Sequence, residues 1–174
     1  MSLTLVIGNK NYSSWSMRPW VLLQQAGIPF TEILLKFHSA DWDRNIARLS
    51  PSHLVPVLWD GPPGEASSTC VWESLAIAEY LAERFPGRTI WPADRRARAQ
   101  ARAISAEMHA GFRNLRNAMP MNIRSQHPGK GYNPEVARDI ARIELLWRDA
   151  RARFGEGGPF LFGEFSAADA MYAP

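Results

Sequence analysis

The stretch LTLVIGNKNYSSWSMRPWVLLQQAG, residues 3–27, decides how the fold begins. Residues 3–7 are a short apolar run of β character, and residues 8–14 form a polar turn. Residues 16–26 have the pattern of a helix, and Gly27 behind them is a typical helix stop. The stretch therefore predicts a strand, a loop and a helix, in that order.

Strands and helices continue to alternate beyond this stretch. We expect a strand at 28–35, a helix at 41–48, strands at 55–59 and 69–72, and a helix at 74–85. A Gly- and Pro-rich segment separates the last two strands, which predicts a hairpin with a long loop. This order of elements is that of a small α/β sandwich, so we assign residues 1–86 to a first domain.

The rest of the sequence has no strand signal, and we expect residues 95–174 to form an all-helical domain. Residues 95–118 are alanine-rich and helical, whereas residues 120–133 contain Pro, Gly and His and are typical of a loop. An apolar stripe at steps of three and four predicts another long helix, with these side chains in the core: Val136, Ile140, Ile143, Trp147, Ala150 and Phe154.

The end of the sequence predicts one more helix. Ser166 and Asp169 have the spacing of a capping box, so this helix should begin at Ala167. The sequence reaches Pro174 before a typical helix length of ~10 to 14 residues is complete. We therefore expect either a short helix or a helical domain that is truncated in this sequence.

Composition restricts the class of protein. The 174 residues are 46% hydrophobic, which is typical of a globular chain. No apolar run approaches the ~18 residues of a membrane span, and the N-terminus lacks the pattern of a secretory signal. A single cysteine, Cys70, excludes an internal disulfide and a Cys-x-x-Cys redox or zinc site. We expect a soluble cytoplasmic protein with no metal and no membrane partner.

The charge balance argues against a nucleic-acid partner. The chain has 20 basic and 17 acidic residues, for a net charge of +3, and its arginines lie among acidic residues on predicted helices. No aromatic and basic recognition motif accompanies them. An anionic small molecule requires much less positive charge.

Three motifs resemble those of the glutathione transferases, in the same order and at similar spacing. The segment Ser13-Ser14-Trp15-Ser16-Met17-Arg18 is similar to the serine motif of the zeta, theta and tau classes. Val55-Pro56 resembles the family's cis-proline, and Glu73-Ser74 resembles its Glu/Gln-Ser signature. The resemblance implies a thioredoxin-like first domain, an all-α second domain, glutathione as co-substrate and a homodimer.

Glu73 and Ser74 suit the γ-glutamyl end of glutathione. Ser74 opens a predicted helix, and the unpaired N–H groups and dipole of a helix start favour a carboxylate. The Ser74 hydroxyl can donate to that carboxylate, and Glu73 can accept from the α-ammonium group. Alternatively, Ser74 only caps the helix.

Val55 and Pro56 suit the backbone of the tripeptide. The resemblance implies a cis peptide bond, which would expose the N–H and C=O of Val55 to the ligand. Only ~5 to 6% of X-Pro bonds in folded proteins are cis, so the alternative is a trans proline at the start of a strand.

Ser13 and Ser14 suit the thiol. A serine hydroxyl at a helix start can donate to the sulfur anion, and a hydrogen bond to a charged group contributes ~1.5 to 3 kcal/mol. The pKa of the thiol then falls by about one to two units from ~8.5, which leaves the sulfur largely ionised at neutral pH. The resemblance aligns Ser13 with the catalytic serine, so we expect Ser13 to act and Ser14 to be the second hydroxyl of the zeta-type pair. Helix capping is the alternative role for both serines, and Ser16 suits that role better.

The sequence also departs from the family pattern. Trp15 stands where zeta members carry a cysteine, and Cys70 lies in a predicted buried strand, so a mixed disulfide with glutathione cannot form at the helix start. Leu54 replaces the Lys or Gln of many members, which removes one contact to glutathione. His53 is a candidate for a replacement contact.

Two side chains are candidates for the pocket of the co-substrate. Trp15 and Met17 lie next to the serines, whereas we expect Trp20 to pack within its domain. The function that these motifs predict is a glutathione transferase, which joins the thiolate of glutathione to an electrophilic small molecule, as in detoxification. The alternatives are a glutathione-dependent cis-trans isomerase of the zeta (maleylacetoacetate isomerase) type and a non-catalytic member that uses the fold for protein contacts.

Overall fold

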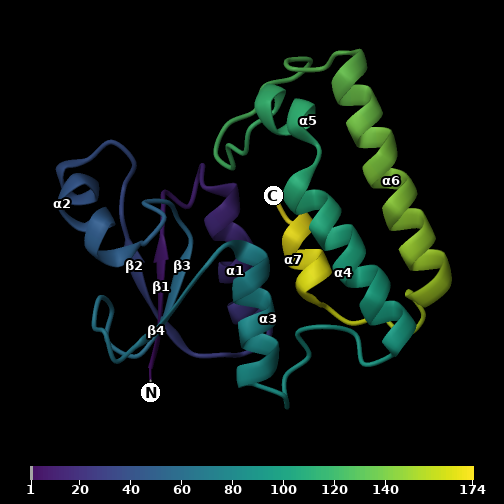
Figure 1. The fold of residues 1–174 in the computed structure, drawn as a ribbon. Helices are drawn as coiled ribbons and strands as arrows, with labels where there is room; N and C mark the ends of the chain where they lie inside the picture. Colours follow the sequence, from purple (N-terminus) through teal and green to yellow (C-terminus); the bar gives the residue numbers. More distant parts are fainter. Residues whose placement is uncertain (1) are drawn as a thin grey trace.

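The computed structural model of the chain describes residues 2–174. A sheet with helices on both faces leads into a group of helices at its side (Figure 1). The elements run in the following order: β1 Leu3–Ile7, α1 Ser14–Gln25, β2 Phe30–Leu34, α2 Ala40–Leu49, β3 Val57–Asp60, β4 Thr69–Trp72, α3 Ser74–Arg84, α4 Arg95–Ala110, α5 Arg113–Ala118, α6 Pro134–Phe154 and α7 Ala167–Tyr172.

The sheet has the order β2-β1-β3-β4. Strand β1 pairs in parallel with β2 and antiparallel with β3, and β3 pairs antiparallel with β4. The pairing of β3 with β4 confirms the predicted hairpin. The βαβαββα order and the mixed sheet confirm the thioredoxin-like fold that the motifs implied.

Alternation along β1 explains the two cores of this half of the chain. Leu3, Leu5 and Ile7 point to the face covered by α1 and α3, and Val6 points to the face covered by α2. The core on the α2 side is small, whereas the other core continues into the helical part of the chain. Helices α1 and α3 therefore lie between the sheet and the helices that follow (Figure 1).

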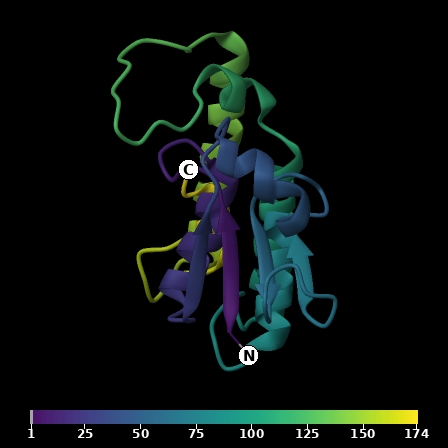
Figure 2. The same ribbon diagram turned by 90° about the vertical axis from the view of Figure 1, so that its left-hand side faces the viewer.

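Helix α7 packs against both α1 and α4, and so joins the two halves of the molecule (Figure 1). Its capping box is present as predicted: Ser166 accepts from the first turn, and the Asp169 carboxylate accepts from the Ser166 N–H at 2.9 Å. A long loop leads from α5 to α6 (Figure 2), and the N–H of Ile123 in this loop donates to the carbonyl of Asn11, in the loop after β1, at 3.3 Å. None of the helices that the structure describes is long and apolar enough to cross a membrane.

The structure corrects two predictions for the helical part. The helix expected over 95–118 is broken at Gly111, where a Cβ atom would lie 2.7 Å from the carbonyl oxygen of Glu107. Phe112 follows with a φ of 54°, so the chain leaves the helix there and starts α5. Trp147 is also not a core residue, because it is 39% exposed and Leu146 occupies the buried face of α6 instead.

Candidate functional site

The three motifs meet at one edge of the sheet. Val57, at the start of β3, pairs with Val6 near the end of β1 and with Trp72 at the end of β4. Because β3 is antiparallel to both neighbours, the loop after β1, the Val55-Pro56 bend before β3 and the Glu73 turn after β4 lie at the same edge. The fold therefore brings together the residues that the sequence placed in one site.

The serine motif forms the start of α1. Ser13 is the N-cap residue, and its Oγ accepts from the N–H of Ser16 at 3.4 Å and donates to Ser16 Oγ at 2.8 Å. Ser16 Oγ also accepts from the N–H of Gly8 at 3.1 Å. Ser13, and not Ser16, is therefore the capping residue. Ser14 is half-buried, and its hydroxyl has no hydrogen-bond partner among residues 2–174.

The peptide bond between Val55 and Pro56 is cis, as the resemblance implied. Within residues 2–174, neither the N–H nor the carbonyl of Val55 has a hydrogen-bond partner, so both remain available to an extended peptide ligand. Leu54 and His53 precede this bond and are exposed, and His53 has a φ of 57°. His53 is thus close to the site in sequence, but its side chain makes no hydrogen bond or ion pair within residues 2–174 that would define a role.

Helix α3 begins without a side-chain cap. Its N-cap residue is Glu73, which has a φ of 72° and makes no side-chain hydrogen bond to the first turn. A positive φ is costly for glutamate and is typical of residues held in place at functional sites. Ser74 is the first helical residue, is 3% exposed and donates from Oγ to the carbonyl of Trp15 at 3.2 Å. Ser74 is therefore not the cap, and the first N–H groups of α3 stay open to an anion.

A residue of the helical domain contacts Glu73. His109 lies in the last turn of α4, and its Nε2 is 3.4 Å from Oε2 of Glu73. The Nδ1 atom of His109 is buried and has no partner in the described chain. A buried N–H group without an acceptor costs more free energy than a buried nitrogen lone pair without a donor. The geometry therefore favours the tautomer of His109 that carries its proton on Nε2, facing Glu73. No sequence pattern predicts this contact, because it joins residues of two domains.

Trp15 packs between the domains. The guanidinium of Arg18 lies 4.2 Å from its ring centroid and that of Arg116 lies 5.1 Å away, while the His109 ring contacts it edge-on. Arg18 is 4% exposed, and its Nε donates to the carbonyl of Met171 in α7 at 2.8 Å. Burial, and secondarily the charge of Arg116, lower the pKa of Arg18 to about 10. The Trp15 ring is thus part of a contact between the two domains in which two arginines pack against it.

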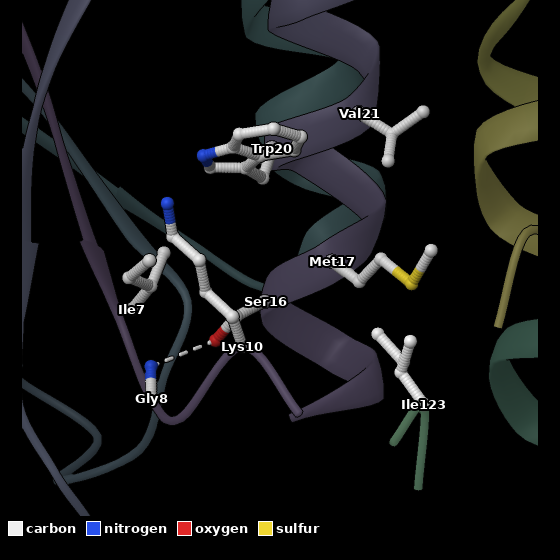
Figure 3. A pocket seen from close by; sticks show the side chains of 8 residues that line it. All are labelled: Ile7, Gly8, Lys10, Ser16, Met17, Trp20, Val21 and Ile123. Carbon is white, nitrogen blue, oxygen red and sulfur yellow. Dashed lines mark hydrogen bonds between the residues drawn. The ribbon is translucent and has the colours of Figure 1, made fainter. Parts of the chain in front are cut away.

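An apolar cavity of about 210 Å³ lies along the other side of α1 (Figure 3). Of the two candidates for the co-substrate pocket, Met17 lines this cavity and Trp15 does not. Trp20 also lines it, and its Nε1 donates to Glu32 at 2.6 Å. The complete lining is Ile7, Gly8, Lys10, Ser16, Met17, Trp20, Val21 and Ile123. Through Ser16, this cavity touches the hydrogen-bonded serine pair.

The described residues hold no group of three or more His, Cys, Asp or Glu side chains placed for a metal ion. Cys70, on the outer strand β4, is half-buried, in contrast to the buried position that we expected. Burial raises the pKa of its thiol, which opposes reactivity.

Residues 12–84 match the family described as glutathione S-transferase, N-terminal domain. Residues 12–84 therefore form a glutathione S-transferase N-terminal domain. The matched region contains the serine motif, the cis-proline and Glu73-Ser74. It begins at residue 12, within the loop that follows β1.

Similar proteins in this family differ in activity. The chain is 23% identical over 166 residues to a probable maleylacetoacetate isomerase of Caenorhabditis elegans, covering 92% of this chain and 74% of the relative. It is 22% identical over 171 residues to the glutathione S-transferase GstB of Escherichia coli, covering 98% and 80%. A glutathione transferase homologue from Burkholderia, solved with bound glutathione, superposes with a TM-score of 0.66 at 23% identity, covering 99% of this chain and 79% of that one.

Proposed function

We propose that the chain binds glutathione at this sheet edge and transfers its thiolate to an electrophilic small molecule. The observation that carries the proposal is the uncapped start of α3, which lies at the same edge as the unpaired backbone of Val55 and the serines of α1. These three segments offer what an anionic tripeptide with a thiol needs: anion contacts, backbone pairing and a donor to sulfur. The bound glutathione of the Burkholderia homologue supports this ligand.

The γ-glutamyl group would lie at the start of α3. Its carboxylate would accept from the free N–H groups of the first turn, which the helix dipole favours. Its ammonium would bind Glu73, whose Oε1 has no partner in the described chain while Oε2 faces His109. Glu73 is half exposed, with 54% of its side chain accessible, so a ligand can reach it.

Ser13 and Ser14 are the two candidates for the hydrogen-bond donor to the thiolate. The motif resemblance assigns the hydrogen bond to Ser13, whereas the free hydroxyl of Ser14 is the one that needs no rearrangement. We propose Ser13, because its partner Ser16 lines the apolar cavity in which an electrophile would meet the sulfur. Sulfur would then attack an electrophilic carbon and form a thioether. In a substitution the leaving group departs with its bonding electron pair; in an addition the π electrons of a conjugated double bond move away from that carbon and take up a proton.

Titration calorimetry with glutathione tests the binding step, with S-methylglutathione as a ligand that cannot form a thiolate. Incubation with a panel of electrophiles then tests transfer, by mass spectrometry of the conjugate and by loss of free thiol. No binding of either ligand would contradict the proposed site. Binding without conjugation of any electrophile would support a non-catalytic role of the fold.

A glutathione-dependent isomerase is the second candidate. The zeta-type serine pair and the similarity to a probable maleylacetoacetate isomerase favour it, and Trp15 at the cysteine position opposes it. An isomerase returns its glutathione unchanged. Turnover of a cis-configured substrate with a constant thiol concentration would therefore decide for isomerisation.

We also propose that the protein is a homodimer, as the family resemblance implies. Exposed apolar side chains of Leu54 and Trp72, 61% and 43% accessible, lie at the edge of the sheet that carries the site. We expect them to be covered by a second copy. Sedimentation equilibrium at micromolar concentration should give twice the chain mass, and a monomer would contradict this proposal.

A further inference from the structure

The hydrogen bonds of the buried serine pair at the start of α1 leave one hydroxyl proton without an acceptor in the described chain. Ser16 Oγ receives the N–H of Gly8 and the hydroxyl of Ser13, and Ser13 Oγ receives the N–H of Ser16. The hydroxyl proton of Ser16 has no acceptor within residues 2–174. Ser13 and Ser16 are 7% and 3% exposed, so water does not readily compensate.

An anion beside Ser13 would supply the missing acceptor. Ser13 then turns its proton to the anion, and the Ser16 hydroxyl, 2.8 Å away, donates to Ser13 in its place. Every hydroxyl proton now has an acceptor, and the Gly8 N–H still donates to Ser16 (Figure 3). The bonds then run in one direction, from Gly8 through Ser16 and Ser13 to the anion, and successive bonds polarise each other.

We infer that Ser16 is a positioning residue for the reaction, which directs the hydroxyl proton of Ser13 to the glutathione sulfur. The inference rests on the proposed function, since the thiolate is the anion in question. Ser16 does not touch the ligand; it acts through Ser13. The one charged side chain that lines the same cavity, Lys10, binds Glu32 at 2.8 Å, so its charge is already paired.

The experiment measures the pKa of bound glutathione from ultraviolet thiolate absorbance, together with kcat and KM. In Ser16→Ala, the Ser13 hydroxyl remains, but in the complex it no longer accepts a hydrogen bond from the Ser16 hydroxyl. Cooperative strengthening of ~10 to 30% per bond, applied to a bond that shifts the pKa by about one to two units, predicts a rise in the thiol pKa of about 0.1 to 0.6 units, smaller than in Ser13→Ala. At neutral pH, kcat should fall by up to about 4-fold, because a smaller fraction of the bound thiol is ionised, whereas glutathione affinity at low pH, where the thiol is neutral, should not change.

Ser16→Thr keeps the hydroxyl, and its added methyl group has the adjacent cavity to occupy, so the thiol pKa should return to the wild-type value. If Ser16→Ala does not fold, Ser16→Cys provides a side chain of similar shape with a weaker donor. A merely structural role predicts a different result, in which Ser16→Ala weakens S-methylglutathione binding as much as glutathione binding.

The outcomes separate the two proposals. If wild-type protein binds glutathione with a lowered thiol pKa and Ser13→Ala raises it, an unchanged pKa in Ser16→Ala overturns the role of Ser16 alone. A parallel loss of S-methylglutathione affinity overturns it as well. If wild-type protein does not bind glutathione, the proposed function fails and the inference fails with it.

Discussion

The hydroxyl of Ser74 donates a hydrogen bond to the carbonyl oxygen of Trp15 across 3.2 Å, which joins the starts of α3 and α1. The two helix starts that would hold the γ-glutamyl group and the cysteinyl thiol of the tripeptide are thus joined by one hydrogen bond. The Ser74 hydroxyl must leave Trp15 to donate to a ligand carboxylate, whereas the N–H groups of α3 need no such change.

Ser74→Ala should weaken glutathione binding by about 1 to 2 kcal/mol, because a donor to a carboxylate is lost. It should also lower the free energy of unfolding by about 1 kcal/mol, since the Trp15 carbonyl loses its partner. Titration calorimetry and urea unfolding measure the two effects. Ser67→Ala, on an exposed position of the β3–β4 loop, is the control that should change neither. An unchanged dissociation constant for Ser74→Ala would argue against this position of the glutamyl carboxylate.

Glu73→Gly should stabilise the fold while it weakens binding. Glycine adopts the φ of 72° without strain, so the free energy of unfolding should rise by about 1 kcal/mol despite the added flexibility of the unfolded chain. Loss of the carboxylate removes the partner of the glutathione ammonium. Thermal unfolding should show the gain in stability, and calorimetric titration should show the loss of glutathione affinity.

Glu73→Gln provides the matched comparison, since it removes the charge and keeps the strained backbone. It should weaken glutathione binding without the gain in stability. A glutathione analogue that lacks the α-amino group should bind wild type and both variants equally. Unequal binding of that analogue would show that Glu73 does not act on the ammonium.

Ser13→Ala should raise the pKa of the bound thiol by about one to two units, and catalysis at neutral pH should fall with it. Ser14→Ala should leave the pKa unchanged if Ser13 is the donor. Ultraviolet thiolate absorbance against pH, recorded for wild type and both variants, distinguishes the two serines. A shift in Ser14→Ala alone would move the assignment by one residue, and no shift in either would exclude the serine mechanism.

Asp60 should make the stability of the fold sensitive to acid. It is 4% exposed; burial raises the pKa of its carboxyl, but hydrogen bonds from Arg84 and Tyr80 outweigh this and hold the pKa below its usual value. A folded-state pKa below the unfolded value of ~3.9 gives stability that is present above that pH and lost as the pH falls through the folded pKa. Urea unfolding from pH 7 to pH 3 should therefore show a loss of stability that Asp60→Asn reduces.

At neutral pH, Asp60→Asn should itself cost about 2 kcal/mol, because two hydrogen bonds to a charged group are weakened. Asp43→Asn, an exposed position on α2, is the control with little effect. The same acid sensitivity in Asp60→Asn and wild type would show that other carboxyl groups are responsible.

The elements of the first domain could be predicted closely because local signals agreed with the fold. The strand at 69–72 and the helix start at Ser74 coincide with the structure, and Gly27 follows the end of α1 as expected. Gly111 was missed because one glycine in an alanine-rich helical pattern is tolerated; the break depends on the approach of the Glu107 carbonyl, which the sequence does not display.

The site could be predicted only where its residues are close in sequence to a motif. The cis bond before Pro56 was predicted in this way and is confirmed, and Ser13 and Glu73 were proposed as site residues in the same way. The role that we propose for Ser16 could not be predicted, because it depends on a bond to Gly8 across the turn. The contact of His109 with Glu73 depends on how α4 packs, and no pattern within either helix predicts it.

Arg18 ties the two domains together, so that neither domain would keep its native contacts if the chain were cut between them. Its side chain starts on α1 and donates to the carbonyl of Met171 on α7, while its Nη1 is buried with no partner among the residues that the structure describes. An isolated first domain would keep this guanidinium on its surface with neither the carbonyl nor the helix that enclose it here. The chain should therefore melt as a single calorimetric unit, so that heat or denaturant empties the ligand site and releases the helices in the same transition.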